Sequence, residues 1–436
     1  MNEFPKVSLI SVLTAIKDGT HGTHARVRSG VPFLSAKNIT EYGSVHWDNT
    51  DDLISESEYE AIHSVFKLFP GDILLTIVGT IGRCAIFHGE KVTFQRSVAY
   101  LRPKTNKIET KFLYHQISSP FFTKKLKEKA NVTAQPGLYL GELSDVDVYL
   151  PDNKDEQKAI ATVLDTMDEA IQSTQAMLDK QDKIKQGLLH DLLTLGVDEY
   201  DNLRPSPEIA PDLYQQTEIG LIPKGWQLTT LGDKEYFDIQ TGGTPSTSVP
   251  AYWQGGTIPW MSSGEIHEKI LTETRQKITQ LGFDSSNAKY YPLQTILIAL
   301  AGQGKTRGTI AISEIELTSN QSIAGIIVNK KKIDPYFLYY LLDSQYEQLR
   351  SASAGAGRAG LSKTILSSYQ IPLPKKEEQS KISDRLTALR IFNDENKNTL
   401  SKLKKLKSGL MQDLLTGRKR MTPALIRDVE KLAEAA

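Results

Sequence analysis

The chain contains a long internal repeat, and no other feature of the sequence constrains its fold as strongly. At an offset of 222 positions, residues 156–194 align without a gap with residues 378–416, and 14 of the 39 columns are identical. The phrase GLLHDLLT at Gly187–Thr194 returns as GLMQDLLT at Gly409–Thr416. A repeat of this length indicates a duplicated structural unit.

Both copies of the repeat predict one long amphipathic helix. Apolar residues recur every three or four positions, which forms a heptad seam. A helix of 40 residues spans about 60 Å, too long for the core of a compact domain, so a spacer is the better interpretation. Residues 154–196 carry a net charge of −3 and residues 375–420 one of +7, so pairing of one helix with the other is favoured. The seam positions that we expect to pack or to dock a partner subunit are Ile160, Leu164, Leu178, Leu188, Leu192, Ile382, Leu386, Leu400, Leu410 and Leu414.

The two ends of each predicted helix carry further signals. Asn153 and Glu156 have the spacing of a capping box at the first helix start. At the other end, Leu189 and Leu193 lie beside the seam, as do Met411 and Leu415 in the second copy. The last turns are therefore apolar over more than one face. We expect this extra face either to pack against a globular domain or to dock another subunit.

The segments that precede the helices repeat more faintly. VPFLSAKNI at Val31–Ile39 matches IPWMSSGEI at Ile258–Ile266, and KFLYHQISS at Lys111–Ser119 matches YFLYYLLDS at Tyr336–Ser344. Short β-branched runs between Gly and Pro turns, with one or two helices, predict an α+β fold in which each segment is mixed α/β. The predicted organisation is two globular domains (1–151 and 226–374), two long helices (152–196 and 375–417), a proline-rich linker (197–225) and a tail (418–436).

Composition narrows the class of protein. The chain has 52 basic and 52 acidic side chains, so its formal charge is zero, although a protein that binds nucleic acid alone is usually basic. Its single cysteine, Cys84, excludes a disulfide framework and fits a reducing cytoplasm. The sequence shows neither a signal peptide nor an apolar run long enough to span a membrane. We therefore expect a cytoplasmic protein with no membrane partner.

Few motifs suggest catalysis. ALAGQGKT at Ala299–Thr306 fits a loose phosphate-loop pattern, but a nucleotide-binding loop needs a helix after it, and RGTIAIS predicts a strand. A hairpin turn that carries cations is the better interpretation, and an ATPase or nuclease that uses Lys305 is the alternative. His21 and His24 have a spacing that suits a metal, but no carboxylate or cysteine partner is evident. The sequence therefore nominates no catalytic residue and no metal ligand.

A binding architecture remains, because two similar modules joined by long helices suit a ligand with a regular repeat, such as duplex DNA. Cations beside small polar groups in loops suit phosphates and base edges. The alternative is a scaffold that binds only protein through its helices. The candidate DNA-binding residues are Lys37, Asn38, Arg83, Arg96, Ser263, Lys305, Arg307, Gln321 and Arg358.

The repeated pattern resembles the specificity subunits of type I restriction–modification systems. The pattern LP…EQ..I…L…GLL.DLLTG lies at Leu150–Gly196 and returns, with Met411 for the third residue of GLL, at Leu373–Gly417. TEIGLIPKGWQLTTLGD at Thr217–Asp233 is similar to the entry of their target-recognition domains, and QTGGTPSTSVPAYWQGGTIPWMSSGEI at Gln240–Ile266 is similar to the opening of such a domain. The first half lacks both of these, so contact residues do not transfer from one half to the other.

This resemblance implies two target-recognition domains separated by an antiparallel coiled coil, with a pseudo-twofold internal repeat. Each domain would read one half of a split, asymmetric site in double-stranded DNA, and the helix pair would set the number of unread base pairs. The helices would also dock two adenine methyltransferase subunits, which use S-adenosylmethionine. Restriction subunits that use ATP and Mg²⁺ would then join. The resemblance implies no active site and no cofactor in this chain itself.

Overall fold

The computed structural model describes residues 3–130, 137–302, 305–352 and 360–435. The chain divides into two compact units, one of residues 1–178 with 396–436 and the other of residues 179–395. Each unit contains one globular domain and one end of each long helix. The boundaries between the units therefore fall inside both helices, whereas the sequence placed domain boundaries at the helix ends.

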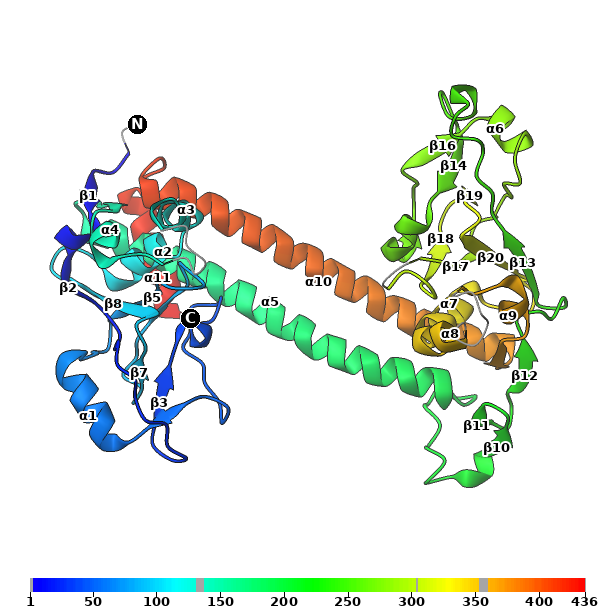
Figure 1. Ribbon diagram of the computed structural model, residues 1–436, viewed down its shortest axis with the longest axis horizontal. Helices are drawn as coiled ribbons and strands as arrows, with labels where there is room; N and C mark the ends of the chain where they lie inside the picture. Colours follow the sequence, from blue (N-terminus) through cyan, green and yellow to red (C-terminus); the bar gives the residue numbers. More distant parts are fainter. Residues whose placement is uncertain (1–2, 131–136, 303–304, 353–359, 436) are drawn as a thin grey trace. The chain divides into compact units, whose positions relative to one another are not determined.

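The globular domain of the first unit contains two main sheets (Figure 1). The larger is antiparallel, in the order β2 (Leu13–Asp18), β8 (Val98–Pro103), β5 (Ile73–Thr76) and β6 (Cys84–Ile86). In the smaller, β3 (Val31–Leu34) runs antiparallel to β4 (Leu53–Ile54) and parallel to β7 (Thr93–Phe94). The remaining elements are the pair β1 (Lys6–Ser8) and β9 (Asp147–Tyr149), the helices α1 (Glu56–Val65), α2 (Thr110–Ile117), α3 (Pro120–Lys129) and α4 (Leu140–Ser144), and the 3-10 turns η1 (Leu9–Val12) and η2 (Ala36–Asn38).

The second unit repeats these sheets. Its larger sheet has the order β13 (Phe237–Thr241), β20 (Ile323–Val328), β17 (Ile296–Ala299), β18 (Ile310–Ser313) and β15 (Ile270–Leu271). In the smaller, β14 (Ile258–Met261) runs antiparallel to β16 (Gln276–Ile278) and parallel to β19 (Thr318–Ser319). The remaining elements are the pair β12 (Gln227–Thr230) and β21 (Gln370–Leu373), the helices α6 (Gln280–Asp284), α7 (Pro335–Ser344), α8 (Tyr346–Ala352) and α9 (Lys363–Ser367), and the 3-10 turns η4 (Pro250–Tyr252) and η5 (Ser263–Glu268).

Each strand pairing of the first unit has a counterpart of the same direction in the second. The mixed pairing of the small sheet is the clearest case, because a parallel neighbour and an antiparallel neighbour flank β3 in one unit and β14 in the other. The faint sequence matches therefore mark a duplicated fold. The predicted fold class, two mixed domains with two long helices, is confirmed.

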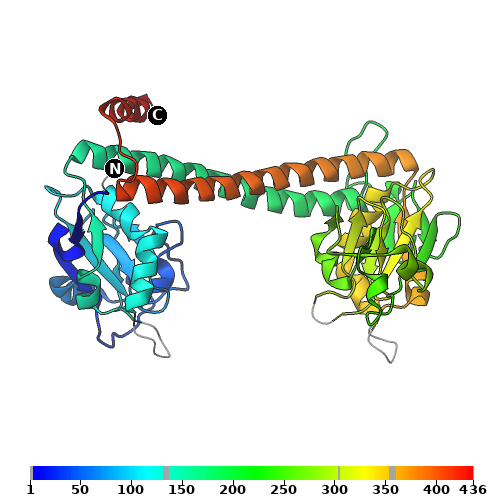
Figure 2. The same ribbon diagram turned by 90° about the horizontal axis from the view of Figure 1, so that it is seen from above.

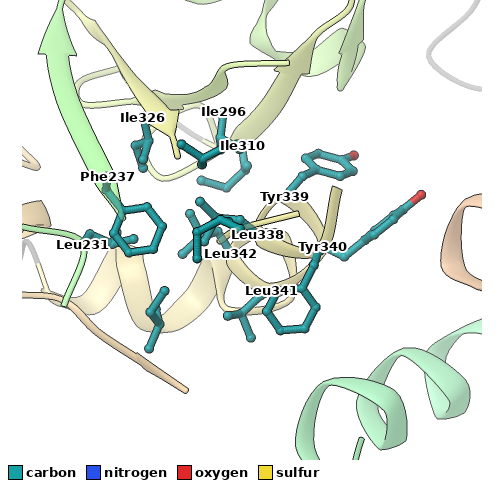
Figure 3. Close-up of a cluster of buried hydrophobic side chains, with 14 of the residues drawn as sticks. Leu231, Phe237, Ile296, Ile310, Ile326, Leu338, Tyr339, Tyr340, Leu341 and Leu342 are labelled. Carbon is teal, nitrogen blue, oxygen red and sulfur yellow. The ribbon is translucent and has the colours of Figure 1, made fainter. Parts of the chain in front are cut away.

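The core of the second unit shows how one helix organises a globular domain. Pro335 occupies the first turn of α7, and the carboxylate of Asp334 accepts hydrogen bonds from the next two backbone N–H groups, at 3.0 and 3.1 Å. Leu338 and Leu342 are fully buried and point toward Phe237, which lies on β13 (Figure 3). The surrounding aliphatic side chains come from the strands of the large sheet, Ile296, Ile310 and Ile326.

The helices α5 (Lys154–Thr194) and α10 (Lys376–Thr416) each contain 41 residues, and Figure 2 shows both as unbroken ribbons, α5 in green and α10 in orange to red. Within the first unit they run antiparallel. Asp168 on α5 binds Lys407 on α10 at 2.5 Å. Ten residues further along α5, Leu178 packs in the same cluster as Leu400, which precedes Lys407 on α10. Positions therefore rise along α5 while they fall along α10. Opposite charges and apolar seam residues both contribute to this pairing, as the sequence predicted.

The second residue of the repeat fixes each helix to its globular domain by the same hydrogen bonds. The side-chain carbonyl of Gln157 accepts from the backbone N–H of Glu109 at 2.8 Å, and its amide donates to the carbonyl of the proline before the helix at 2.9 Å. Gln379 makes the equivalent bonds, to the N–H of Asp334 at 2.8 Å and to the preceding proline at 2.9 Å. Both side chains are fully buried or nearly so. Their identity in the two copies therefore has a structural reason.

The first residue of the repeat, Glu156, binds the segment that follows the other long helix, α10. Arg420, just beyond α10, donates two hydrogen bonds of 2.9 and 2.8 Å to the carboxylate of Glu156, and the backbone N–H of Met421 donates a third at 2.9 Å. Asn153 caps α5 by accepting from the N–H of Asp155 at 2.8 Å. The predicted capping box is therefore wrong in its second part, because the carboxylate of Glu156 serves this longer-range contact. We call this arrangement the first helix clasp.

The second helix clasp has the same design in the second unit. Arg204, which follows α5, binds the carboxylate of Glu378 through both terminal nitrogens, at 2.5 and 3.0 Å. The indole N–H of Trp226 and the backbone N–H of Val197 also donate to this carboxylate, at 3.0 and 3.1 Å. The two arginines lie at different distances from their helices, so the repeat alignment does not pair them. The linker that contains Arg204 also includes η3 (Pro211–Leu213) and the hairpin of β10 (Tyr214–Thr217) and β11 (Gly220–Pro223).

The last turns of both helices pack into the globular domains. Leu193 belongs to the core of the second domain, and Met411 and Leu415 belong to the core of the first. Of the two outcomes expected for this apolar face, packing against a globular domain is therefore the one observed. The predicted seam residues divide among three clusters: Ile160, Leu164, Leu410 and Leu414 pack in the first domain, Leu178 and Leu400 pack between the helices, and Leu188, Leu192, Ile382 and Leu386 pack in the second domain. After α10 the tail forms α11 (Pro423–Ala435).

Candidate nucleic-acid interface

In each unit, backbone hydrogen bonds gather several loops at one end of the large sheet. In the second unit, the N–H of Leu300, just beyond β17, donates to the carbonyl of Ser322 at 2.8 Å. In the first unit, the N–H of Ile77, just beyond β5, donates to the carbonyl of Ser97 at 2.9 Å. These bonds bring the turn after the central strand beside the loop before the next strand. Most of the candidate DNA-binding residues in the described ranges lie on these loops.

The turn between β17 and β18 anchors Lys305 by its backbone and leaves its side chain exposed. Its carbonyl accepts hydrogen bonds from the hydroxyls of Thr309 at 2.8 Å and of Tyr346 at 3.0 Å. A strand follows the turn, so the predicted hairpin is confirmed and the helix that a phosphate loop requires is replaced by β18. Gly304 lies outside the described residues. The arrangement presents an exposed lysine on an anchored backbone, and β18 replaces the helix that an ATPase loop would need.

Arg307 and Arg350 lie near this turn. The guanidinium of Arg350, on α8, donates to the hydroxyl of Tyr346 at 2.8 Å. The Cβ of Arg350 lies close to Gly308 in the turn, because a Cβ added to Gly308 would be 3.6 Å from it. Arg307 is half-buried, and its buried Nε finds no partner among the described residues. A buried guanidinium N–H without an acceptor is unusual, and a bound anion would satisfy it. Sequence reasoning missed Arg350, which lies on a helix.

The other candidates of the second unit flank the same turn. Ser263 is half-buried at the start of η5, and the ring of His267 on η5 lies 3.2 Å from the hydroxyl of Thr306. Gln321 is exposed, and its side-chain carbonyl accepts from the hydroxyl of Thr244 at 2.6 Å. These amide and hydroxyl groups lie on segments that adjoin the turn, and together with its cations they form a mixture that suits phosphates and base edges. Arg358 lies outside the described residues.

The equivalent turn of the first unit is built differently. The hydroxyl of Thr76 accepts from the backbone N–H of Arg83 at 2.9 Å, and the guanidinium of Arg83 binds Glu41 at 2.8 Å. Gly82 has a φ of +98°, and a Cβ there would lie 3.0 Å from the side chain of Thr123 on α3. The turn therefore packs directly against α3, as the other turn packs against α8. The ion pair with Glu41 partly neutralises Arg83.

The helix α3 supplies cations that sequence reasoning missed. Lys124 and Lys127 are exposed and line a shallow hollow of about 740 Å³ with Thr123. Glu128 is only 3.9 Å from Lys124, a surface pair that contributes little. The run KKLKEK at the end of α3 was the available signal. Because α3 and α8 occupy equivalent places in the two units, each central turn has a helix beside it that carries basic side chains, four lysines on α3 and Arg350 on α8.

The remaining candidates of the first unit lie on η2 and the loop after β7. Asn38 is buried, and its amide donates to the carboxylate of Asp51 at 3.0 Å and to the carbonyl of His46 at 3.0 Å. Hydrogen bonds from Asn38 and then Lys37 lower the pKa of Asp51 to about 2. The side chain of Asn38 is therefore engaged internally, whereas that of Arg96 is exposed. The loop that carries Arg96 adjoins η2, because the hydroxyl of Ser97 accepts from a backbone N–H there.

Each of the two histidines singled out in the sequence has a carboxylate partner that the sequence did not reveal. His24 binds Glu58 and the hydroxyl of Thr20, and His21 binds Asp18 at 2.6 Å. In the part of the chain that the structure describes, no group of three or more histidine, cysteine or acidic side chains could hold a metal ion. Nor does any helix in those ranges have the length and apolar character needed to cross a membrane.

Comparison with known proteins places this geometry in a family. The family model of the type I restriction modification DNA specificity domain matches the chain twice, over residues 28–182 and 223–405. The MjaX type I restriction enzyme specificity subunit of Methanocaldococcus jannaschii is 26% identical over 433 residues, which cover 95% of this chain and 93% of the relative. The MjaIX specificity subunit of the same organism is 33% identical over 191 residues, 42% of each chain.

Solved structures share the fold. The S subunit of a type I restriction-modification system from M. genitalium superposes with a TM-score of 0.61 at 17% identity, over 94% of this chain and 96% of that one. A chain from a structural study of type I complex assembly gives a TM-score of 0.53 at 16% identity, over 96% and 98% of the two chains. The family matches cover most of the sequence, one in each half of the repeat. The chain belongs to the family of type I restriction–modification DNA specificity subunits.

Proposed function

We propose that each globular domain reads one half of a bipartite, asymmetric DNA site. The observation that carries this proposal is the duplication of the cationic sheet end, with Lys305 and Arg350 in one unit and Arg83 and Lys127 in the other. Two readers of different sequence recognise two different half-sites. Because Ser263 and Gln321 have no identical counterparts in the first unit, the two halves of the site differ in base sequence.

The helices α5 and α10 set the number of unread base pairs between the half-sites. They also dock two adenine methyltransferase subunits, and the restriction subunits join the complex through these. Their length of 41 residues each supports the first role, since an α-helix rises about 1.5 Å per residue. The duplication of the helices supports the second, because two equal subunits need two equivalent docks. S-adenosylmethionine, ATP and Mg²⁺ belong to those partners, which complete the positive charge that this neutral cytoplasmic chain lacks.

The test is to co-express the chain with the neighbouring methyltransferase gene and to map adenine methylation by long-read sequencing. We expect a split motif with one modified adenine on each strand. Replacing residues 226–374 with the matching domain of a relative should change one half of the motif only, and replacing residues 1–151 should change the other. A short unbroken motif, or a chimera that alters both halves, would refute the assignment.

A scaffold that binds only protein is the competing function. Neutral substitutions at Lys305, Arg350, Lys124 and Lys127 distinguish the two, because an interface for phosphates loses affinity as cations are removed. Unchanged DNA binding by this quadruple variant would favour the scaffold.

A further inference from the structure

A stretch of α10 in the first unit carries unbalanced positive charge. Residues 396–408 contain five lysines and no acidic residue. Lys407 binds Asp168 on α5, but Lys397, Lys402, Lys404 and Lys405 are exposed and make no ion pair within the described residues. Like charges three or four positions apart oppose each other on a helix. This charge therefore destabilises the isolated helix and needs an explanation outside it.

Part of this charge lies on one face of the helix. Lys397, Ser401, Lys404 and Ser408 follow one another at spacings of three and four, and with Lys405 they line a shallow hollow of about 410 Å³. We call these five residues the lysine stripe. Leu400 is the one apolar member of the hollow, and it is buried.

The lysine stripe continues directly from the first recognition domain. Leu415 lies seven residues beyond Ser408, on the same helix face, and is fully buried in the core of that domain. The face that seats the recognition domain at one end of α10 therefore presents lysines as it leaves the domain. A ligand that extends past this domain along α10 meets these side chains.

The other copy of the repeat lacks most of the stripe, because only Lys405 has an identical counterpart there, Lys183. At the same alignment positions α5 has Gln175 for Lys397, Asp179 for Ser401 and Asp182 for Lys404. Charge pairing with α5 accounts for Lys407, which binds Asp168, but Lys397 and Lys404 make no ion pair within the described residues and are not explained in this way. A function specific to α10 explains them.

We propose that the lysine stripe binds the phosphate backbone of the DNA next to the half-site read by the first recognition domain. The inference rests on the proposed DNA-reading function. Ammonium and hydroxyl groups without an exposed apolar side chain suit phosphates, whereas a protein partner needs an apolar centre to its interface. The eleven residue steps from Lys397 to Ser408 span about 16 Å, close to five base pairs at 3.4 Å each. Contacts of this kind add affinity to unread base pairs without reading them.

The test measures how salt affects binding of the full-length chain, assembled with its methyltransferase subunits, to a labelled duplex that contains its mapped motif. The Lys397→Gln, Lys404→Gln double variant should lower the slope of log affinity against log salt by about 1.8, because each phosphate contact contributes about 0.9. We expect affinity near 0.1 M salt to fall about tenfold. The matched control is Lys402→Gln with Lys431→Gln, which removes two exposed lysines of the same unit outside the stripe. It should leave the slope nearly unchanged.

A second arm locates the contact on the DNA. Neutral methylphosphonates beside the first half-site should weaken binding by the wild-type chain and leave the stripe variant unaffected. Equal slopes for the stripe variant and the wild type overturn the proposal, as does a variant that binds DNA normally but no longer retains methyltransferase subunits, since the face would then bind protein. A wild-type assembly of the chain with its methyltransferase subunits that binds no duplex refutes the proposed function itself, and the stripe proposal with it.

Discussion

Replacing Glu378 with alanine should strongly destabilise the second unit. The side chains of Glu378 and Arg204 are only 14% and 18% exposed, and the carboxylate also accepts from Trp226 and Val197. Removing one partner of a buried ion pair costs about 3–5 kcal/mol, because the other charge stays desolvated. Each buried N–H that loses its acceptor adds about 1–3 kcal/mol, less where water reaches it. We expect the free energy of unfolding of this unit to fall by about 4 kcal/mol.

The first helix clasp is the internal control for this prediction. Glu156 is 3% exposed but Arg420 is 51% exposed, so solvent screens their attraction. A double-mutant cycle with Arg204→Met should give a coupling of about 2–3 kcal/mol with Glu378, and one with Arg420→Met should give about 1 kcal/mol with Glu156.

Urea unfolding followed by tryptophan fluorescence reports mainly on the second unit, because Trp226, Trp253 and Trp260 lie there and Trp47 alone lies in the first. Hydrogen exchange of backbone amides reports on both units separately, so it measures the first clasp. The reasoning fails if the Glu378–Arg204 coupling is no larger than the Glu156–Arg420 coupling, since burial would then not control the strength of these pairs.

Further outcomes follow from other contacts. Gln379→Ala should lower the free energy of unfolding of the second unit by about 2–3 kcal/mol, and Gln157→Ala should lower that of the first by a similar amount, because each variant leaves buried backbone groups without partners. Hydrogen exchange of backbone amides should show that each variant destabilises one unit only. Asp51 has a folded pKa of about 2, below its ordinary 3.8, so its contribution to stability is present above pH 4 and is lost as pH falls from 4 to 2. Asn38→Ala should raise that pKa, which carboxyl NMR would measure, and an unchanged value would contradict the hydrogen-bond explanation. Deleting one heptad from both α5 and α10 should shorten the unread spacer by about three base pairs, as methylation mapping would show; an unchanged spacer would refute the role of helix length.

The sequence predicted those features that rest on periodicity. A seam of leucines needs only its spacing, so the 41-residue helices and their buried faces followed from Leu164, Leu386 and their neighbours. The strand after Lys305 followed from β-branched residues in the same way. These signals are local, so one sequence contains them fully.

Partners far apart in the chain gave no such signal. Glu156 has the spacing of a capping residue, but it binds Arg420, which lies 264 positions away. Asn38 looked like a polar loop residue, yet its amide is buried against Asp51. Arg350 and the lysines of α3 join the candidate interface only because a helix packs beside a turn. Tertiary packing decides which polar side chains form internal hydrogen bonds and which remain exposed for a ligand. The spacing of residues in the sequence does not contain this information.

The helix clasps differ in how the chain passes through them. In the second unit the linker of residues 197–225 leads from the exit of α5 to the next globular domain. In the first unit the exit of α10 packs beside the segment before β1, where the N–H of Phe4 donates to the carbonyl of Thr416 at 2.8 Å. Arg418 also binds Glu3 at 3.2 Å. Each half of the sequence therefore contributes the carboxylate of one clasp and the arginine of the other, Glu156 and Arg204 in the first half and Glu378 and Arg420 in the second. Each half also supplies the last helical turns of the other half's core, Leu193 in the second unit and Leu415 in the first, so neither half completes a hydrophobic core by itself.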